Sequence, residues 1–339
     1  MKVAILRESK RDKKGREVEN RVVLPPNLAT KLKNIELMVE TKAGEKIGHS
    51  DQDYEKIGAR IVSHSEALTA DLILGVKETQ KDDFPYLKPH TIFMSYQHFA
   101  ESKERTTAAL RSKATFICLE TIEVDHKFPC LAPMSEAAAR VLVRHADWFA
   151  LHSSKTIGCG LSQTGFKKLK VTVLGMGTVG RTAAQEFKQR GYEVAEIDRP
   201  NISELKNAIK GSFFAVSSMY IAGASPQKLI TKELLRSMQP GGCVYPVDID
   251  QGGGIEGAVL TSILDPFDLP KIEGTDIYCF APPNLPSLGA RTTSEALGSA
   301  ILPYVDKLIR KESDPALDLG VNIQNGRILH AGLASIFPK

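Results

Sequence analysis

Short apolar runs alternate with segments of helical periodicity along most of the chain. In the first part, strand-like runs lie at residues 3–6, 36–39, 71–76, 91–96 and 115–119. Segments 26–33 and 101–112, between these runs, have the apolar spacing of amphipathic helices. Strands that alternate with helices form βαβ units, so we predict an α/β fold with mainly parallel sheets.

A long helical pattern leads into a second α/β series. Residues 135–152 are rich in Ala, Leu and Val, and Ser135 is a residue type that often caps a helix N-terminus. The second series has strand-like runs at 170–174, 193–197, 213–219 and 243–250, and helical patterns at 178–190, 231–238 and 293–309. We predict two Rossmann-like, doubly wound domains, in which a cofactor domain of residues 133–289 is inserted into a discontinuous substrate domain of residues 1–132 and 290–339.

The composition is that of an ordinary globular protein. Of the 339 residues, 42% are apolar and 25% are charged, and 44 Lys and Arg against 40 Asp and Glu give a net charge of +4. We therefore expect no nucleic-acid partner, and no apolar stretch reaches the ~20 residues of a membrane span. The five cysteines are scattered without a CxxC pair, so we expect no disulfide framework, no metal site and a cytoplasmic location.

A glycine-rich turn provides the first chemical signal. The segment from Gly175 to Gly180 fits GxGxxG, with a strand pattern before it and a helical pattern after it. Gly175 would allow the tight turn, Gly177 the approach of a pyrophosphate, and Gly180 the close packing of helix and strand. With Thr178 and Val179 at the helix start, the turn predicts a dinucleotide cofactor held at a helix N-terminus.

Asp198 indicates which dinucleotide binds. It ends the next predicted strand, about 20 residues after the glycine turn, where a carboxylate can accept hydrogen bonds from the adenosine ribose. Because a 2′-phosphate there would meet a like charge, we predict NAD as the cofactor. Arg199 follows directly, and since arginine can bind a 2′-phosphate, NADP stays open.

Four polar residues lie at or beside predicted strand ends: Arg21, Lys77, His98 and Asp250. Each alone also fits a structural role, such as a solvated strand end, a core histidine or a turn cap. Ligands of open parallel sheets bind outside the C-terminal strand ends, so the four are considered together. They suit the oxidation of an amino acid, with Arg21 and Lys77 as cations for the carboxylate. His98 would move protons, with Asp250 as its partner carboxylate.

Several motifs in order give the chain a family resemblance. They include Glu19-Asn-Arg-Val-Val-Leu-Pro, Ser95-Tyr-Gln-His-Phe-Ala, Ala132-Pro-Met-Ser-Glu, Val247-Asp-Ile-Asp-Gln-Gly-Gly and Asn284-Leu-Pro. With these motifs, the sequence resembles the alanine dehydrogenase and transhydrogenase α-subunit family over nearly its whole length. The resemblance implies an NAD-dependent amino-acid dehydrogenase that assembles as a homo-oligomer, a dimer or a hexamer.

The resemblance also implies roles for individual residues. Catalytic roles fall on His98, Asp250 and Lys77, substrate binding on Arg21, Lys77 and Asn284, and cofactor binding on Ser135, Gly175, Gly177, Thr178, Val179, Gly180 and Asp198. The chain departs from the family pattern where only about twenty residues follow Asp198 before the segment matching residues 217–224. Asp248 stands where a small apolar residue is usual. It is interpreted either as a second carboxylate of the site, on the same strand face as Asp250, or as a solvent-facing acid.

Three functions follow from these observations. The first is an NAD-dependent L-alanine dehydrogenase, which interconverts alanine with pyruvate and ammonia. The second is an opine-type enzyme that condenses pyruvate with a basic amino acid at the expense of NAD(P)H, similar to carboxyethylornithine synthases. The shortened cofactor domain and Asp248 favour the second function. The third is a transhydrogenase-like NAD-binding subunit, which would need a membrane partner.

Overall fold

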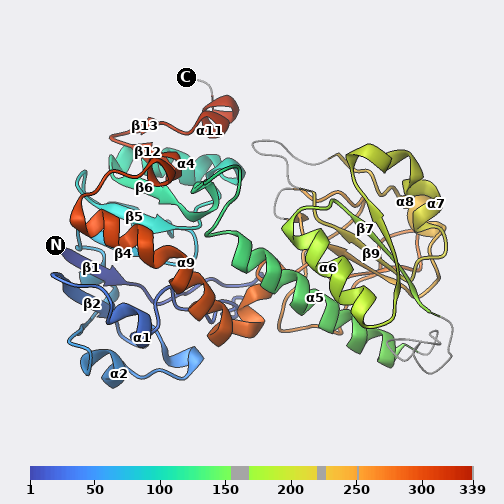
Figure 1. Ribbon diagram of the computed structural model, residues 1–339, viewed down its shortest axis with the longest axis horizontal. Helices are drawn as coiled ribbons and strands as arrows, with labels where there is room; N and C mark the ends of the chain where they lie inside the picture. Colours follow the sequence, from blue (N-terminus) through green and yellow to red (C-terminus); the bar gives the residue numbers. More distant parts are fainter. Residues whose placement is uncertain (154–167, 220–226, 250–251, 338–339) are drawn as a thin grey trace. The chain divides into compact units, whose positions relative to one another are not determined.

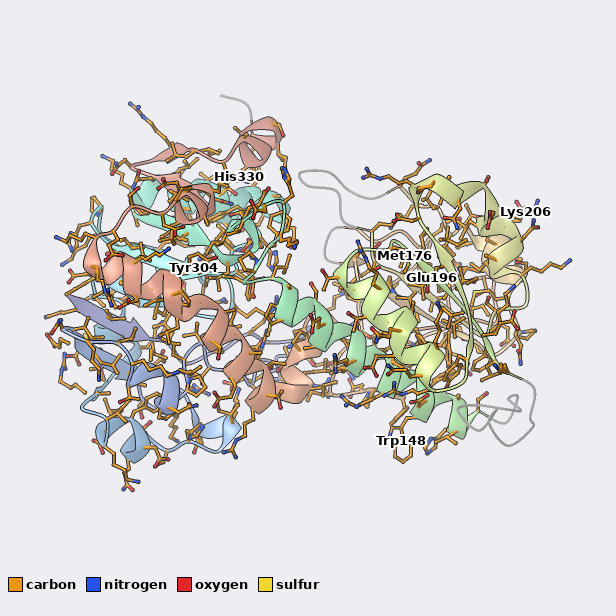
Figure 2. All side chains as sticks on the ribbon, in the orientation of Figure 1. Trp148, Met176, Glu196, Lys206, Tyr304 and His330 are labelled. Atoms are coloured by element: carbon orange, nitrogen blue, oxygen red, sulfur yellow. The ribbon has the colours of Figure 1, made fainter. Side chains whose placement is uncertain are left out.

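The computed structural model describes residues 1–153, 168–219, 227–249 and 252–337 (Figure 1). The chain divides into two compact units, one formed by Met1–Met134 with Gly289–Lys339 and the other by Ser135–Leu288. Each unit has its own sheet of mainly parallel strands, so the predicted α/β class is confirmed. Figure 2 shows the described side chains on both units.

The first unit is built on an eight-stranded sheet of order β13-β12-β6-β5-β4-β1-β2-β3. Its strands are β1 (Lys2–Ile5), β2 (Glu36–Glu40), β3 (Arg60–Val62), β4 (Leu72–Leu74), β5 (Ile92–Ser95), β6 (Thr115–Cys118), β12 (Val321–Gln324) and β13 (Arg327–Ile328). Its helices are α1 (Pro26–Ala29), α2 (Asp51–Glu55), α3 (His64–Ala67), α4 (Lys103–Ser112), α9 (Ala290–Arg310), α10 (Pro315–Gly320) and α11 (Ala331–Ile336). Strands β1 to β6 pair in parallel, whereas β12 pairs antiparallel with β6 and with β13.

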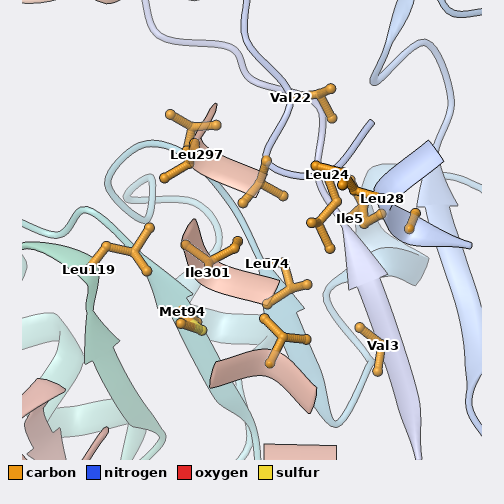
Figure 3. Packing of buried hydrophobic residues seen from close by; sticks show 14 of the residues in the cluster. Val3, Ile5, Val22, Leu24, Leu28, Leu74, Met94, Leu119, Leu297 and Ile301 are labelled. Atoms are coloured by element: carbon orange, nitrogen blue, oxygen red, sulfur yellow. The ribbon is translucent and has the colours of Figure 1, made fainter. Parts of the chain in front are cut away.

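Apolar residues cover both faces of this sheet, which is why its strands are apolar without interruption. Val3 and Ile5 belong to one buried cluster and Ala4 belongs to another, as the alternation of side chains along a strand requires. Figure 3 shows Ile5 in the first cluster together with Leu297 and Ile301 of α9. The C-terminal segment therefore completes the core of a unit that begins at the N-terminus.

The second unit is built on a five-stranded parallel sheet of order β11-β10-β9-β7-β8. Its strands are β7 (Lys170–Leu174), β8 (Glu193–Ile197), β9 (Phe214–Ser217), β10 (Cys243–Pro246) and β11 (Tyr278–Cys279). Its helices are most of α5 (Ala132–His152), α6 (Thr178–Gln189), α7 (Leu205–Ile209) and α8 (Lys232–Arg236), with 3-10 turns η6 (Arg199–Glu204) and η8 (Leu285–Gly289). Helix α6 packs on β7 and β8, so the glycine turn between β7 and α6 lies at the C-terminal edge of the sheet.

Among the predicted boundaries that differ from the structure, two concern candidate site residues. The long helix α5 begins at Ala132 and ends at His152, so Ser135 lies in its first turn and does not cap it. The helix begins earlier because Ala132 N–H bonds to Phe128 O, and because a proline such as Pro133 is tolerated in the first turn. Strand β10 ends at Pro246, before Asp248, because the chain turns where Val247 N–H bonds back to Tyr245 O.

No helix within the described residues combines the length and the apolar character needed to cross a membrane. The same residues contain no group of three or more His, Cys, Asp or Glu side chains placed to hold a metal ion.

Candidate active site

The three glycines of the turn differ in what surrounds them. Gly175 has a φ of +90°, and a Cβ added to it would lie 3.0 Å from the backbone of Ser218. A Cβ on Gly180 would lie 1.8 Å from Gly175 O, whereas one on Gly177 would have no atom within 4 Å. The first and last glycines are thus needed for the turn itself, and the middle one leaves open space beside the backbone.

The start of helix α6 offers unsatisfied N–H groups. Gly177 is its N-cap, no side chain of the described residues caps it, and its first turn contains no acidic residue. Thr178 is exposed and Val179 packs partly against the core of the unit. The free N–H groups and the positive end of the helix dipole face the position that a phosphate would take. The turn therefore fits the pyrophosphate of a dinucleotide.

Asp198 lies beside this turn. Leu174 and Ile197 are paired across β7 and β8, and Gly175 N–H bonds to Ile197 O at 2.8 Å. One carboxylate oxygen of Asp198 accepts the N–H of Arg199 at 3.0 Å, and the residue caps the turn η6. The side chain is half-buried, so a carboxylate stands next to the glycine turn, where a ribose hydroxyl could reach it.

The remaining predicted residues of the first unit meet at one edge of its sheet. Because β1, β4, β5 and β6 are parallel neighbours, their C-terminal ends share this edge. Lys77 follows β4 and His98 follows β5, and Arg21 lies at the end of the long loop that follows β1. The charge of Arg21 acts on Lys77, and Lys77 and His98 both act electrostatically on Glu78. The structure therefore brings Arg21, Lys77 and His98 into one charged cluster.

Arg21 is buried at 3% exposure and paired with Glu19, which is fully buried. Arg21 Nε and Nη2 each donate to a different oxygen of Glu19 at 2.7 Å, while Nη1 lies 3.0 Å from Met134 Sδ. Burial alone would lower the pKa of Arg21, but the charge and hydrogen bonds of Glu19 raise it. Burial opposes ionisation of Glu19, yet Arg21 lowers its pKa overall. Both groups therefore remain charged.

Lys77 is also buried, at 8% exposure, and is not the solvated strand end that its position in the sequence also allowed. Among the described residues, its Nζ has neither a hydrogen-bond partner nor an ion-pair partner. Burial lowers the pKa of Lys77, and the positive charge of Lys10 lowers it further. Glu78, the adjacent acid, is 3.2 Å from Lys10 Nζ. The Lys77 ammonium is thus available for a ligand.

Glu8 supports the backbone next to Lys77 and was not among the predicted site residues. Its carboxylate accepts the N–H of Val76 at 2.5 Å and that of Lys77 at 3.2 Å. Burial, aided by the charge of Glu19, raises the pKa of Glu8 to about 7. A cavity of about 20 Å³ beside Glu8 and Lys77 is large enough for a water molecule.

His98 has a left-handed backbone, with φ +46° and ψ +45°. Its side chain is 27% exposed, and its ring stacks on Tyr96 with centroids 6.2 Å apart. Its Nδ1 lies 3.8 Å from Glu101 Oε1 and 3.9 Å from Glu120 Oε1. His98 is therefore not a fully buried core histidine, and its ring is within reach of solvent or a ligand.

The segment 247–253 contains two acids of interest, Asp248 and Asp250, of which the structure describes the first. Asp250 lies outside the described residues. Asp248 is buried, so its interpretation as a solvent-facing acid is wrong. Its Oδ2 accepts hydrogen bonds from Ser217 Oγ at 2.6 Å and from the N–H groups of Met219 and Gly254 at 3.2 Å. Burial raises the pKa of Asp248, and its Oδ1 has no hydrogen-bond partner among the described residues.

Asn284 and Ser135 complete the predicted residues that the structure describes. Asn284 is buried at 2% exposure and directly precedes η8, where its carbonyl accepts the N–H of Ser287 at 2.9 Å. Ser135 is half-buried in the first turn of α5.

Comparison with known proteins places the chain in a family. The model of the alanine dehydrogenase/PNT N-terminal domain matches residues 4–138, and that of the C-terminal domain matches residues 199–331. The alanine dehydrogenase of Halomonas elongata is 32% identical over 371 aligned residues, which cover 99% of this chain and 97% of the relative. The chain belongs to the alanine dehydrogenase/PNT family. The alanine dehydrogenase of Geobacillus stearothermophilus is 31% identical, with 99% of this chain and 96% of the relative covered.

Solved structures agree with membership of the alanine dehydrogenase/PNT family. An L-alanine dehydrogenase has a TM-score of 0.86 and 27% identity, with 100% of this chain and 99% of that chain covered. A transhydrogenase from Sinorhizobium meliloti has a TM-score of 0.80 at 21% identity, over 98% and 99% of the two chains, and shows the same fold. These findings confirm the predicted family, the two-domain α/β fold and the expectation of an oxidoreductase.

Proposed function

We propose that the protein is an NAD-dependent L-alanine dehydrogenase, which converts L-alanine reversibly to pyruvate and ammonia. The observation that carries the proposal is that Lys77 and His98 follow the neighbouring parallel strands β4 and β5, with the buried Arg21 acting electrostatically on Lys77. It occurs in a chain that matches proteins named alanine dehydrogenase over 99% of its length at about 30% identity. Fold alone would not indicate an activity, whereas the charged cluster supplies groups that this reaction needs.

The cofactor assignment rests on the glycine turn. Gly177 leaves open space, and the N–H groups at the start of α6 would hold the pyrophosphate of NAD. Asp198 would accept hydrogen bonds from the adenosine ribose and disfavour a 2′-phosphate. Thr178, Val179 and Ser135 would lie along the bound cofactor, as the resemblance implies. When bound, NAD supplies the acceptor for the hydride that leaves Cα of alanine.

The substrate carboxylate would bind to Arg21 and Lys77. Arg21 is held rigidly by Glu19, which fixes the direction of its guanidinium before substrate arrives. Lys77 has an uncommitted ammonium, so it gains a partner when a carboxylate or a carbonyl oxygen binds. Because the ammonium is buried, this interaction is stronger than the same contact in water. Asn284 would contact substrate or nicotinamide from its own segment.

His98 and Asp250 would handle the protons. Alanine loses a hydride from Cα and a proton from its amino group, which leaves an imine. A water molecule then adds to the imine carbon, gives up a proton, and the adduct releases ammonia and leaves pyruvate. A base must accept protons in these steps and an acid must return one to the leaving amine. The partly exposed imidazole of His98 suits this exchange, with Asp250 as the partner carboxylate.

The opine-type alternative uses Asp248 as an extra anion for a basic co-substrate. This carboxylate is buried, and its Oδ2 accepts three hydrogen bonds, whereas its Oδ1 has no partner among the described residues. The short connection between β8 and β9, which contains only η6 and α7, favours the opine-type alternative. In the transhydrogenase-like alternative, the polar residues Arg21, Lys77, His98 and Asp250 would be partly redundant.

A substrate panel distinguishes these functions. L-alanine with NAD should produce NADH without any added amine, and pyruvate with ammonia should consume NADH. Turnover that appears only with pyruvate, NAD(P)H and ornithine or lysine would establish the opine-type function instead. NADH binding without turnover in either mixture would favour the transhydrogenase-like subunit.

We also propose that the protein is a cytoplasmic homo-oligomer, a dimer or a hexamer. The support is the family resemblance and the scattered cysteines. Light scattering of the purified protein measures the number of subunits directly, and a monomer would contradict the proposal.

A further inference from the structure

The backbone of His98 is in a conformation that a residue with a side chain rarely adopts. Its φ of +46° and ψ of +45° place it in the left-handed region, and it directly precedes the 3-10 turn η3 (Phe99–Glu101). Such a conformation persists only where its surroundings hold it, and it is concentrated at functional sites. The contacts that hold this turn therefore decide where the imidazole points.

Glu120 holds the turn from the N–H side. Its carboxylate accepts the N–H of Gln97 at 3.1 and 3.3 Å, and that of His98 at 2.7 Å. Ser95 and Cys118 are paired across β5 and β6, so Gln97 and Glu120 each lie two residues beyond this pair. Glu120 is buried, at 8% exposure, which strengthens these hydrogen bonds.

Arg105 holds the same turn from the C=O side. Its Nη1 donates to Gln97 O at 3.0 Å and to His98 O at 3.4 Å. The peptide groups around His98 thus have an anion at their donors and a cation at their acceptors. Contacts with two charged side chains, one on each side, therefore hold this left-handed turn.

We propose that Glu120 is the positioning residue for His98: it fixes the left-handed turn and thereby the direction of the imidazole. This inference rests on the proposed function, in which His98 moves protons. Glu120 acts on the backbone and not by a hydrogen bond to the ring, because its Oε1 is 3.9 Å from His98 Nδ1. It touches neither the substrate cations nor the glycine turn in any described contact.

Glu101 provides a matched control. Its Oε1 lies 3.8 Å from His98 Nδ1, so its charge acts on the imidazole from almost the same distance as that of Glu120. Unlike Glu120, it accepts neither the Gln97 N–H nor the His98 N–H through its side chain. Substituting each acid in turn therefore separates the effect of a nearby charge from the effect of the backbone contacts.

Other charged or titratable groups also face this turn and are left unchanged in the test. They are Glu78, Arg105 and, at the start of α11, His330, which Figure 2 labels. Burial lowers the pKa of His330 against the opposing charges of Glu120 and Glu123. A change in the pH profile that both acid substitutions share would reflect the loss of a negative charge near His98. A loss of turnover that occurs only in the Glu120 variants would reflect a displaced His98 ring.

The kinetic test compares Glu120→Gln, Glu120→Ala and Glu101→Gln in the oxidation of L-alanine by NAD. We expect kcat to fall at least about tenfold in Glu120→Gln and further in Glu120→Ala, as part of the acid–base contribution is lost. KM for alanine and NADH affinity should stay within about twofold, because the affected group acts on chemistry rather than binding.

Glu101→Gln should keep kcat within about twofold while its kcat/KM pH profile shifts like that of Glu120→Gln. Equal kcat in wild type and Glu120→Gln, or equal losses in Glu101→Gln, would overturn the inference.

A structural test is independent of the reaction. We expect a crystal structure of Glu120→Ala to show His98 with a negative φ or a displaced ring, while that of Glu101→Gln keeps the left-handed turn. A His98 φ that stays near +46° in Glu120→Ala, with the ring in its wild-type position, would overturn the inference even if the wild type proved inactive with alanine. Absence of alanine oxidation by the wild type would count against the proposed function alone.

Discussion

Arg21 and Glu19 form a bidentate ion pair that is almost completely removed from solvent. Both nitrogen–oxygen distances are 2.7 Å, and the two side chains are 3% and 0% exposed. A buried charge without its partner is costly, whereas an exposed ion pair contributes little. The pair therefore orients the guanidinium that we assign to the substrate, and it makes Glu19 essential to the fold around it.

Removing the charge of Glu19 should be far more damaging than removing that of an exposed acid. We expect Glu19→Gln to lower the free energy of unfolding by about 3–5 kcal/mol and to raise KM for alanine. Glu36, whose exposed carboxylate lies 3.2 Å from Arg60, provides the control: Glu36→Gln should cost no more than about 1 kcal/mol. Urea unfolding measures both values. Similar losses in the two variants would show that burial does not determine how much the Arg21–Glu19 pair contributes to stability.

Glu8 should make stability depend on pH in the opposite sense to an ordinary ion-paired acid. Its folded pKa of about 7 exceeds the ordinary value of 4.5, so the folded state binds the proton more tightly than the unfolded state. Its contribution to stability is therefore complete below pH 4.5 and is lost as pH rises through 7. From the two pKa values, the loss amounts to about 3 kcal/mol.

The variant Glu8→Gln isolates this contribution. Because the amide does not titrate, the difference in unfolding free energy between wild type and Glu8→Gln should change by about 3 kcal/mol between pH 4.5 and pH 8. Relative to Glu8→Gln, the wild type should have a lower free energy of unfolding at pH 8 than at pH 4.5. A difference that stays constant over this range would contradict the raised pKa of Glu8.

The cofactor preference should depend on the charge of Asp198. This residue also caps η6, so we choose Asp198→Asn, which keeps an oxygen for the cap and removes the charge. We expect KM for NAD to rise about tenfold and the discrimination against NADP to fall by a similar factor. Glu196, an exposed acid near the end of β8 that Figure 2 labels, is the control, and Glu196→Gln should leave both values unchanged. Unaltered cofactor preference in Asp198→Asn would remove the ribose assignment.

Two glycines of the same turn should respond differently to alanine. Gly177→Ala places a methyl group in open space, so stability should be unchanged while KM for NAD rises about tenfold. Gly180→Ala places a methyl group 1.8 Å from Gly175 O, so the free energy of unfolding should fall by about 1–3 kcal/mol. Thermal unfolding and NADH titration of both variants separate the two effects. Weakened binding without lost stability in Gly180→Ala would contradict the packing role.

The sequence predicted the convergence of Lys77 and His98 for a simple physical reason. Parallel neighbouring strands end at one edge, and both residues follow such strands. The carboxylates Glu8 and Glu120 were missed because they bind backbone N–H groups, and a backbone partner has no characteristic residue type in the sequence. One signal was present, since Glu120 follows β6 by the same two positions that separate Gln97 from β5.

Two sequence predictions, for Ser135 and Asp248, were wrong because another local interaction outweighed the pattern on which each prediction was based. Ser135 matched the pattern of a helix N-cap. However, Ala132 N–H already bonds to Phe128 O, so helix α5 begins at Ala132. Asp248 was placed on a strand by its apolar neighbours, but β10 ends at Pro246 and the carboxylate turns inward to Ser217. Periodicity predicts strands better than it predicts their ends.

His98 gives the most direct test of the proposed reaction. We expect His98→Ala to lower kcat for alanine oxidation by about 10²–10⁴-fold, because a positioned acid–base group is lost. NADH affinity should change little, since the cofactor would be held by the glycine turn of the other unit. His90, an exposed histidine in the loop before β5, is the control, and His90→Ala should keep wild-type turnover. Stopped-flow measurement of NADH formation and a fluorescence titration of NADH provide the two readouts, and a fully active His98→Ala enzyme would exclude His98 as the proton acceptor.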